Sequence, residues 1–192
     1  MEDFSNQDDY TYEYEEEAQP YSMWQIIRKY SLYLGVAIIG FNLLTFLANM
    51  YLHWAASLVY ILYIAAIVFA HLEYKKKNEG YMSFGQGVGI GTAVATLGAG
   101  VIGAMFFFFY TSTIDPQIGQ NLQEYAQEQS REMLEKWFNY TEEQIEKSQE
   151  SAEKFNSPTL QWLVNILGVA FYGVIFSLII SAFTKKKRPL FE

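Results

Sequence analysis

Residues 84–110 read FGQGVGIGTAVATLGAGVIGAMFFFFY and contain no charged side chain. An uncharged stretch of this length is typical of a helix that crosses a lipid bilayer. Three comparable apolar stretches occupy residues 31–52, 54–72 and 158–183. The chain of 192 residues is 51% hydrophobic with a formal net charge of -8, and its charged residues lie almost wholly outside these stretches. The sequence therefore predicts an all-α membrane protein with four transmembrane helices.

The basic residues gather on one side of the predicted membrane. Nine of the thirteen Lys and Arg residues lie at positions 28–29, 75–77 and 185–188, whereas the turn between the first two apolar stretches has none. Because loops rich in Lys and Arg stay in the cytoplasm, this distribution predicts that both termini are cytoplasmic. The helical insertion between helices 3 and 4 is then extracytoplasmic.

These assignments divide the chain into five segments. Residues 1–20 contain eight acids and no base, and we expect them to form a disordered acidic cytoplasmic tail. The other segments are transmembrane helices 1 to 3 (21–112), an extracytoplasmic helical segment (113–157), transmembrane helix 4 (158–185) and a basic cytoplasmic tail (186–192).

The extracytoplasmic segment has a helical pattern, because apolar residues recur every three or four positions between polar ones. A new start signal after residue 140 indicates two helices, over about 116–138 and 142–156, rather than one continuous rod. Three aromatic side chains are the candidate contacts of these outer helices with a partner: Tyr125, Trp137 and Phe138.

Helix starts are marked by side chains that accept hydrogen bonds from free backbone N–H groups. Ser83 and Thr141 are each followed three residues later by Gln, which completes a capping box. Asp115 and Ser157 each precede a proline, which favours the first helical position. We predict helix caps at these four residues, and a catalytic role for Asp115 is the less favoured alternative.

The third transmembrane helix carries small residues at every fourth position. They are Gly87, Gly91, Ala95, Ala99 and Gly103, and the fourth helix has a shorter version in Gly173, Ser177 and Ser181. Small residues at this spacing let helix backbones approach closely in lipid, where the hydrophobic effect contributes little to helix association. The repeat predicts a helix-packing face, used either within the chain, which we favour, or for self-association.

Four polar residues follow one another at steps of three or four along the first helix: Asn42, Thr45, Asn49 and His53. Together with Asn165 of the fourth helix we expect them to form a polar stripe. Such a stripe serves either interhelical hydrogen bonds, which we favour, or a partial path for a solute. A coupled transporter usually needs an ionisable group within the span, and no Asp, Glu, Lys or Arg lies in the core of the four stretches.

Residues for catalysis or cofactor binding are scarce. The chain has no Cys and two His, which argues against thiolate chemistry and a histidine-rich metal centre. We interpret His71 and Glu73 as ordinary groups of the membrane interface rather than an acid–base pair. The basic clusters are short and lie next to the membrane, which indicates contact with anionic lipid headgroups rather than nucleic acid. We expect no enzymatic activity, no cofactor and no metal site.

Several short motifs occur in an order that matches a known family. They lie at residues 81–86 (YMSFGQ), 114–116 (IDP), 142–147 (EEQIEK), 157–158 (SP) and 177–183 (SLIISAF). With this set the chain resembles, over about residues 25–188, the four-helix membrane proteins of Bacteroidota known as domain of unknown function 4199. The resemblance implies an inner-membrane protein of a Gram-negative bacterium and brings no assigned activity.

Two functions are compatible with these patterns. We expect a non-enzymatic scaffold or accessory subunit that associates through the small-residue helix faces and the outer helices. Its partners are then the lipid bilayer and either a second copy of the chain or another membrane protein. The alternative is a small transporter, pore or lipid-handling protein that uses the polar stripe of the first helix.

Overall fold

The computed structural model describes residues 22–153 and 158–187. These residues are all-helical, with one isolated bridge between Met82 and Lys186 and no strand among them. The elements in chain order are α1 (Met23–Leu47), the 3-10 helix η1 (Trp54–Leu58), α2 (Val59–Lys77), α3 (Phe84–Ala95), the π-helix η2 (Thr96–Gly103), α4 (Ala104–Phe109), the π-helix η3 (Tyr110–Ile114), α5 (Pro116–Phe138), α6 (Glu142–Glu153) and α7 (Pro158–Thr184). The predicted acidic tail, the cap Ser157 and residues 188–192 of the predicted basic tail lie outside the described residues.

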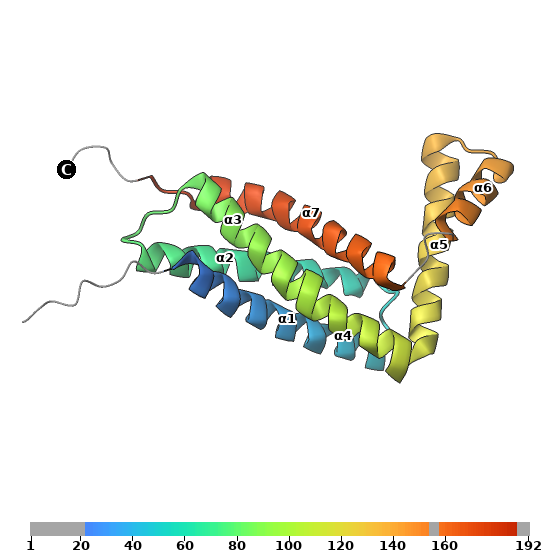
Figure 1. The fold of residues 1–192 in the computed structure, drawn as a ribbon, viewed down its shortest axis with the longest axis horizontal. Coiled ribbons are helices and arrows are strands. Elements are labelled where there is room, and N and C mark those ends of the chain that lie inside the picture. The colour runs from blue at the N-terminus through green and yellow to red at the C-terminus, as the bar shows by residue number, and fades with distance from the viewer. Residues whose placement is uncertain (1–21, 154–157, 188–192) are drawn as a thin grey trace, which may run out of the picture.

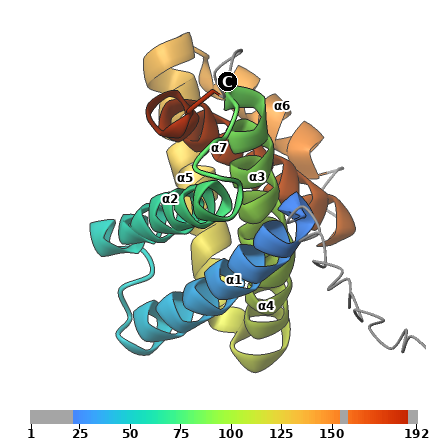
Figure 2. The same cartoon turned by 90° about the vertical axis from the view of Figure 1, so that its left-hand side faces the viewer.

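Four helices are long and apolar enough to cross a membrane: Met23–Leu47, Trp54–Lys77, Phe84–Ile114 and Leu160–Thr184. Figure 1 shows them side by side as a bundle, with α5 and α6 folded into a hairpin at one end. We call this the hairpin end, and we call the opposite end, which carries residues 28–29, 75–77 and 185–187, the basic end. In Figure 2, which looks along the bundle, α5 runs crosswise behind the spanning helices.

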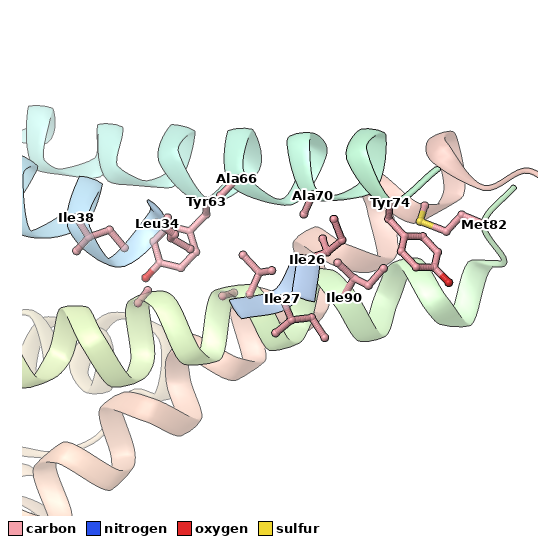
Figure 3. Packing of buried hydrophobic residues seen from close by; sticks show 13 residues of the cluster. Ile26, Ile27, Leu34, Ile38, Tyr63, Ala66, Ala70, Tyr74, Met82 and Ile90 are labelled. Carbon is pink, nitrogen blue, oxygen red and sulfur yellow. The ribbon is translucent and has the colours of Figure 1, made fainter. Parts of the chain in front are cut away.

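The interior and the exterior of the bundle are both apolar. Figure 3 shows the core, in which Ile26, Ile90 and Met82 are fully buried between the spanning helices. Large apolar side chains such as Leu47 and Phe183 also lie exposed on the outside. An apolar exterior of this extent suits helices surrounded by acyl chains, because water would make it a site of aggregation.

α1 ends earlier than the apolar pattern predicts. We expected the first helix to continue to about Leu52, but α1 ends at Leu47 and Asn49 has a left-handed backbone with φ 53°. Asn adopts this conformation at lower cost than most residues, because its short polar side chain bonds locally. The chain therefore turns before His53, which caps η1.

The third spanning helix continues past its predicted end at Tyr110 to Ile114, and it changes its winding on the way. Two stretches are π-helical, Thr96–Gly103 and Tyr110–Ile114. A π turn holds more residues than an α turn, so it rotates the side chains that follow relative to those before. The sequence pattern did not predict this change, although glycine at positions 98, 100 and 103 weakens the preference for a regular α-helix.

The hairpin consists of α5, whose bounds Pro116–Phe138 agree with the expected range, and α6, which begins at Glu142. Asn139 turns the chain between them with a left-handed backbone at φ 51°. Ile118 and Ile145 are its buried apolar side chains among the described residues. The hairpin is therefore held by far less apolar contact than the bundle.

Candidate functional site

α3 and α7 interlock through small residues. Three pairs meet four residues apart along both helices: Gly87 with Ser181, Gly91 with Ser177, and Gly173 with Ala95. A Cβ atom added to Gly87 would lie 2.6 Å from Ser181 Oγ, and one added to Gly173 would lie 2.8 Å from the Ala95 Cβ. The chain therefore uses these small-residue faces between two of its own helices.

Gly91 is the most crowded position of the interlock. A Cβ atom added there would overlap Ser177 Oγ and lie 2.8 Å from Ile67 Cγ2 of α2, whereas nothing lies within 4 Å of one added to Gly89. Ser177 and Ser181 are fully buried, and their hydroxyls have no hydrogen-bond partner among the described residues. Close backbone approach, rather than hydroxyl bonding, characterises this interface.

The later members of the repeat have other neighbours. A Cβ atom added to Gly103 would lie 3.1 Å from Ile38 Cγ2 of α1. Gly98, which is not part of the repeat, also faces α1, because a Cβ atom added there would lie 2.7 Å from the Ser31 carbonyl oxygen. Ala99 is buried in the core cluster. The repeat therefore begins against α7 at Gly87 and Gly91 and ends against α1 at Gly103, and the π-helical stretch between them contacts both helices.

His71 links three helices near the basic end. Its side chain extends from α2 and is fully buried. The Nε2 atom lies 2.8 Å from the Gly87 carbonyl oxygen on α3, and Nδ1 lies 2.9 Å from Thr184 Oγ1 on α7. We expected an interfacial residue because three lysines follow closely, but α2 directs His71 into the bundle. The signal in the sequence was an ionisable residue inside an apolar stretch.

The partners of His71 determine its hydrogen-bonding state. A carbonyl oxygen accepts only, so Nε2 carries a proton and donates to Gly87. In the neutral ring Nδ1 is then an acceptor, and it lies within hydrogen-bonding distance of the Thr184 hydroxyl at 2.9 Å. That hydroxyl also lies 2.9 Å from the Ile180 carbonyl oxygen, and its single proton serves one acceptor at a time.

Glu73 has its partners on α1 rather than at His71. Its Oε2 atom accepts hydrogen bonds from Lys29 Nζ at 2.6 Å and from the Tyr30 hydroxyl at 2.8 Å. Lys29 and Glu73 thereby form an ion pair between α1 and α2. Since His71 and Glu73 contact different helices, they are not arranged for shared acid–base chemistry.

The residues of the predicted polar stripe do not form one row. Asn42 and Thr45 lie on α1, where the Thr45 hydroxyl donates to the Asn42 carbonyl oxygen at 2.9 Å. Asn49 is exposed in the turn beyond α1, and His53 is exposed and caps η1 through Nδ1. Asn165 lies on α7 and lines a cavity against α5. The structure therefore places the five residues in three separate surroundings.

A cavity of about 520 Å³ lies between the end of the third spanning helix, α5 and α7. We call it the hairpin-end cavity. Ala104, Phe107 and Phe108 form an apolar wall, and Gln120 and Asn165 are among the amides opposite. The described residues that line it include no charged side chain. Such a lining suits an uncharged amphipathic molecule better than an ion.

The predicted contact residues of the outer helices are all exposed. Trp137 and Phe138 end α5 at the turn of the hairpin and are 81% and 59% exposed, and Tyr125 lies exposed further back on α5. Phe138 packs edge-on against Tyr140 with ring centres 6.2 Å apart. Aromatic side chains exposed on an otherwise charged hairpin are typical of a contact surface.

Three of the predicted caps make capping hydrogen bonds. Ser83 Oγ accepts from the Gln86 N–H at 3.2 Å, and the Gln86 side chain accepts from the Ser83 N–H at 2.9 Å. Thr141 and Gln144 repeat this exchange at 3.4 and 2.9 Å. Asp115 accepts from the backbone N–H three residues further on at 3.4 Å. These bonds mark where the third spanning helix and both hairpin helices begin.

Four helices that are long and apolar enough to span a membrane indicate that the chain is a helical membrane protein. Within the described residues, no group of three or more His, Cys, Asp or Glu side chains could hold a metal ion. A family model described as "Protein of unknown function (DUF4199)" matches residues 29–186, and the chain belongs to this family. No curated protein and no solved structure matches the chain.

Proposed function

We propose that the protein is a non-enzymatic accessory or scaffold protein in the inner membrane of a Gram-negative bacterium. Both termini then lie in the cytoplasm, because the Lys- and Arg-rich basic end faces that side. The α5–α6 hairpin lies outside the cytoplasm, next to the membrane, and is the element that contacts a partner protein.

The exposed aromatic pair Trp137 and Phe138 is the observation that carries this proposal. Tryptophan is enriched among the residues that contribute most to protein interfaces, and here it is 81% exposed at the turn of a hairpin. The small-residue faces of α3 and α7 are already covered, because the two helices pack these faces against each other. We therefore assign association to the hairpin rather than to those faces.

The charge of the hairpin indicates the chemistry of the partner. Residues 113–153 contain ten acids and three bases. Complementary charge steers association and suppresses wrong partners. The surface that fits best is an apolar pocket for Trp137 and Phe138 with basic residues around it.

Native mass spectrometry of the protein, gently extracted from its host membrane, tests this proposal. We expect one fixed partner protein to accompany the wild type and to be lost from the variant Trp137→Ala/Phe138→Ala. Trp54→Ala is the matched control, because Trp54 is 71% exposed and lies outside the hairpin. Retention of the partner by the double variant, or a clean monomer of the wild type, would contradict the proposal.

The hairpin-end cavity favours the alternative, a small transporter, pore or lipid-handling protein. Its volume of about 520 Å³ and uncharged lining suit part of a lipid or a small apolar solute. A lipid retained by the wild type and lost from Ala126→Trp, which fills the cavity, would favour this function. Asn42→Leu with Asn49→Leu should alter stability alone if the polar stripe is structural.

A further inference from the structure

We infer that a cleft between α1 and α2 at the basic end binds the headgroup of an anionic phospholipid, with an acyl chain lying along α2. The cleft has a volume of about 620 Å³ and is lined by Lys29 and Tyr30 from α1 and by five residues of α2. The two helices lie side by side in Figures 1 and 2 and pack against each other. We call this site the lysine cleft, and it does not depend on the proposed function of the hairpin.

One face of α2 changes its chemistry along the cleft. Phe69, Leu72, Glu73, Lys76 and Lys77 have the spacing that places residues on a single face of a helix. Phe69 and Leu72 are 57% and 51% exposed, and the two lysines lie exposed one turn further toward the basic end. A phospholipid presents the same order of groups, with an apolar chain followed by an anionic head.

The charges within the cleft favour an anion. Three lysines and one glutamate line it, which leaves a formal charge of +2. Glu73 already accepts hydrogen bonds from Lys29 at 2.6 Å and from Tyr30 at 2.8 Å. Its carboxylate therefore acts as a positioning group that holds the Lys29 side chain at the cleft.

The lysines that follow α7 have a different setting. Lys186 lies over the Tyr81 ring, 5.3 Å from its centre, and Lys185 lies over the Phe84 ring, 5.7 Å from its centre. These lysines therefore lie against aromatic rings, whereas Lys76 and Lys77 of the lysine cleft continue a helix face that carries the exposed apolar residues Phe69 and Leu72. The exposed apolar strip formed by Phe69 and Leu72 favours a lipid over a soluble phosphate. A lipid would contact both the lysines and this strip, whereas a soluble anion would contact the lysines alone.

The test uses the full-length protein in a neutral detergent. The probes are diphosphatidylglycerol, whose two phosphodiester groups match the charge of the cleft, and a phosphatidylcholine with the same acyl chains. Native mass spectrometry counts the bound lipids, and the rise in unfolding temperature with lipid concentration reports their affinity. We expect diphosphatidylglycerol to be retained and to raise the unfolding temperature, and phosphatidylcholine to do neither.

Two double variants locate the site. Lys76→Gln/Lys77→Gln should weaken diphosphatidylglycerol binding roughly tenfold or more, since each basic residue near an anionic headgroup contributes severalfold. Lys185→Gln/Lys187→Gln is the matched control, because it removes the same charge from the same end of the bundle, and it should weaken binding less than about threefold. Lipid binding is read as the rise above each variant's own lipid-free unfolding temperature, because Lys185 lies over the Phe84 ring and Lys76 and Lys77 lie in the last turn of α2.

Three results would overturn the inference. Equal losses in the two double variants would show a general attraction to the basic end rather than a site. Displacement of the lipid by an equal concentration of inorganic phosphate would show that the ligand of the lysine cleft is a soluble anion. Equal binding of phosphatidylcholine would show that the charge of the headgroup does not determine binding.

A single variant tests the acyl-chain contact separately. Phe69→Ser leaves every charge in the lysine cleft and removes the larger part of its apolar strip. It should lower lipid retention while the salt dependence of binding stays the same, because that dependence arises from the charges. Unchanged retention would contradict the contact along α2.

Discussion

The spanning bundle and the hairpin are built in opposite ways. In the bundle, small residues let α3 and α7 approach until one added carbon atom would overlap a neighbour, as at Gly91. In the hairpin, Ile118 is the buried residue among those described in α5, and Trp137 and Phe138 lie exposed at the turn. The difference indicates that stability resides mainly in the bundle, where the helix surfaces pack against one another. It is also the basis of our proposal that the hairpin, whose aromatic side chains lie exposed, contacts a partner.

Overfilling the interlock should have the largest effect on the bundle. Gly91→Leu must displace α7 or α2, because an added Cβ atom alone overlaps Ser177 and lies 2.8 Å from Ile67. We expect a loss of roughly 3 kcal/mol in the free energy of unfolding, measured as a lower thermal midpoint by circular dichroism in detergent. Gly89→Leu is the matched control and should keep the wild-type midpoint, because nothing lies within 4 Å of its added Cβ. Equal destabilisation of the two variants would show that the close approach of α3 and α7 is not what stabilises the bundle.

Removing the polar contact inside the bundle should have an intermediate effect. His71→Leu removes the ring nitrogens that contact the Gly87 carbonyl oxygen and the Thr184 hydroxyl. The loss of buried hydrogen bonds of this kind should lower the free energy of unfolding by about 1–3 kcal/mol. Thermal unfolding of the variant checks this expectation. His53→Leu removes the exposed histidine and should cost no more than about 1 kcal/mol, the worth of a helix cap. If the two substitutions cost the same, the buried histidine does not link the three helices energetically.

Removing a cap from the hairpin should have the smallest effect, and one confined to that region. Thr141→Ala deletes the hydroxyl that accepts from the Gln144 N–H and should destabilise α6 by about 1 kcal/mol. Amide hydrogen exchange should speed up in α6 while the thermal midpoint of the bundle stays unchanged. Ser148→Ala, an exposed position within α6, should alter neither quantity. A lower midpoint of the bundle in Thr141→Ala would break the separation between the two regions.

Much of the fold could be predicted because it depends on local patterns. Uncharged apolar stretches identified the four long helices, since length and hydropathy decide whether a helix is able to cross a bilayer. The start of α5 after Asp115 and the turn before Glu142 followed from capping residues, whose hydrogen bonds reach only three residues along the chain. These features need no knowledge of which helices become neighbours.

The features that depend on helix neighbours could not be predicted in the same way. α2 is apolar on most of its surface, so its sequence does not show which side faces the bundle, and His71 looked interfacial beside Lys75. Asn49 has a left-handed backbone in the turn that leads to the next helix. The prediction that the first helix continues past this residue to about Leu52 was therefore wrong. Asn165 faces α5, which its position in the sequence does not indicate. In each case, packing between distant segments determined the result.

The interlock of α3 and α7 also sets an order of assembly during synthesis. Gly87 leaves the ribosome long before Ser181, and the whole hairpin is made between them. Until α7 enters the bilayer, the glycine face of α3 lies open to lipid and to other nascent chains, and His71 has no Thr184 to bind. The last long helix therefore completes the bundle. A chain that is terminated before α7 would leave three helices, with the small-residue face of α3 uncovered.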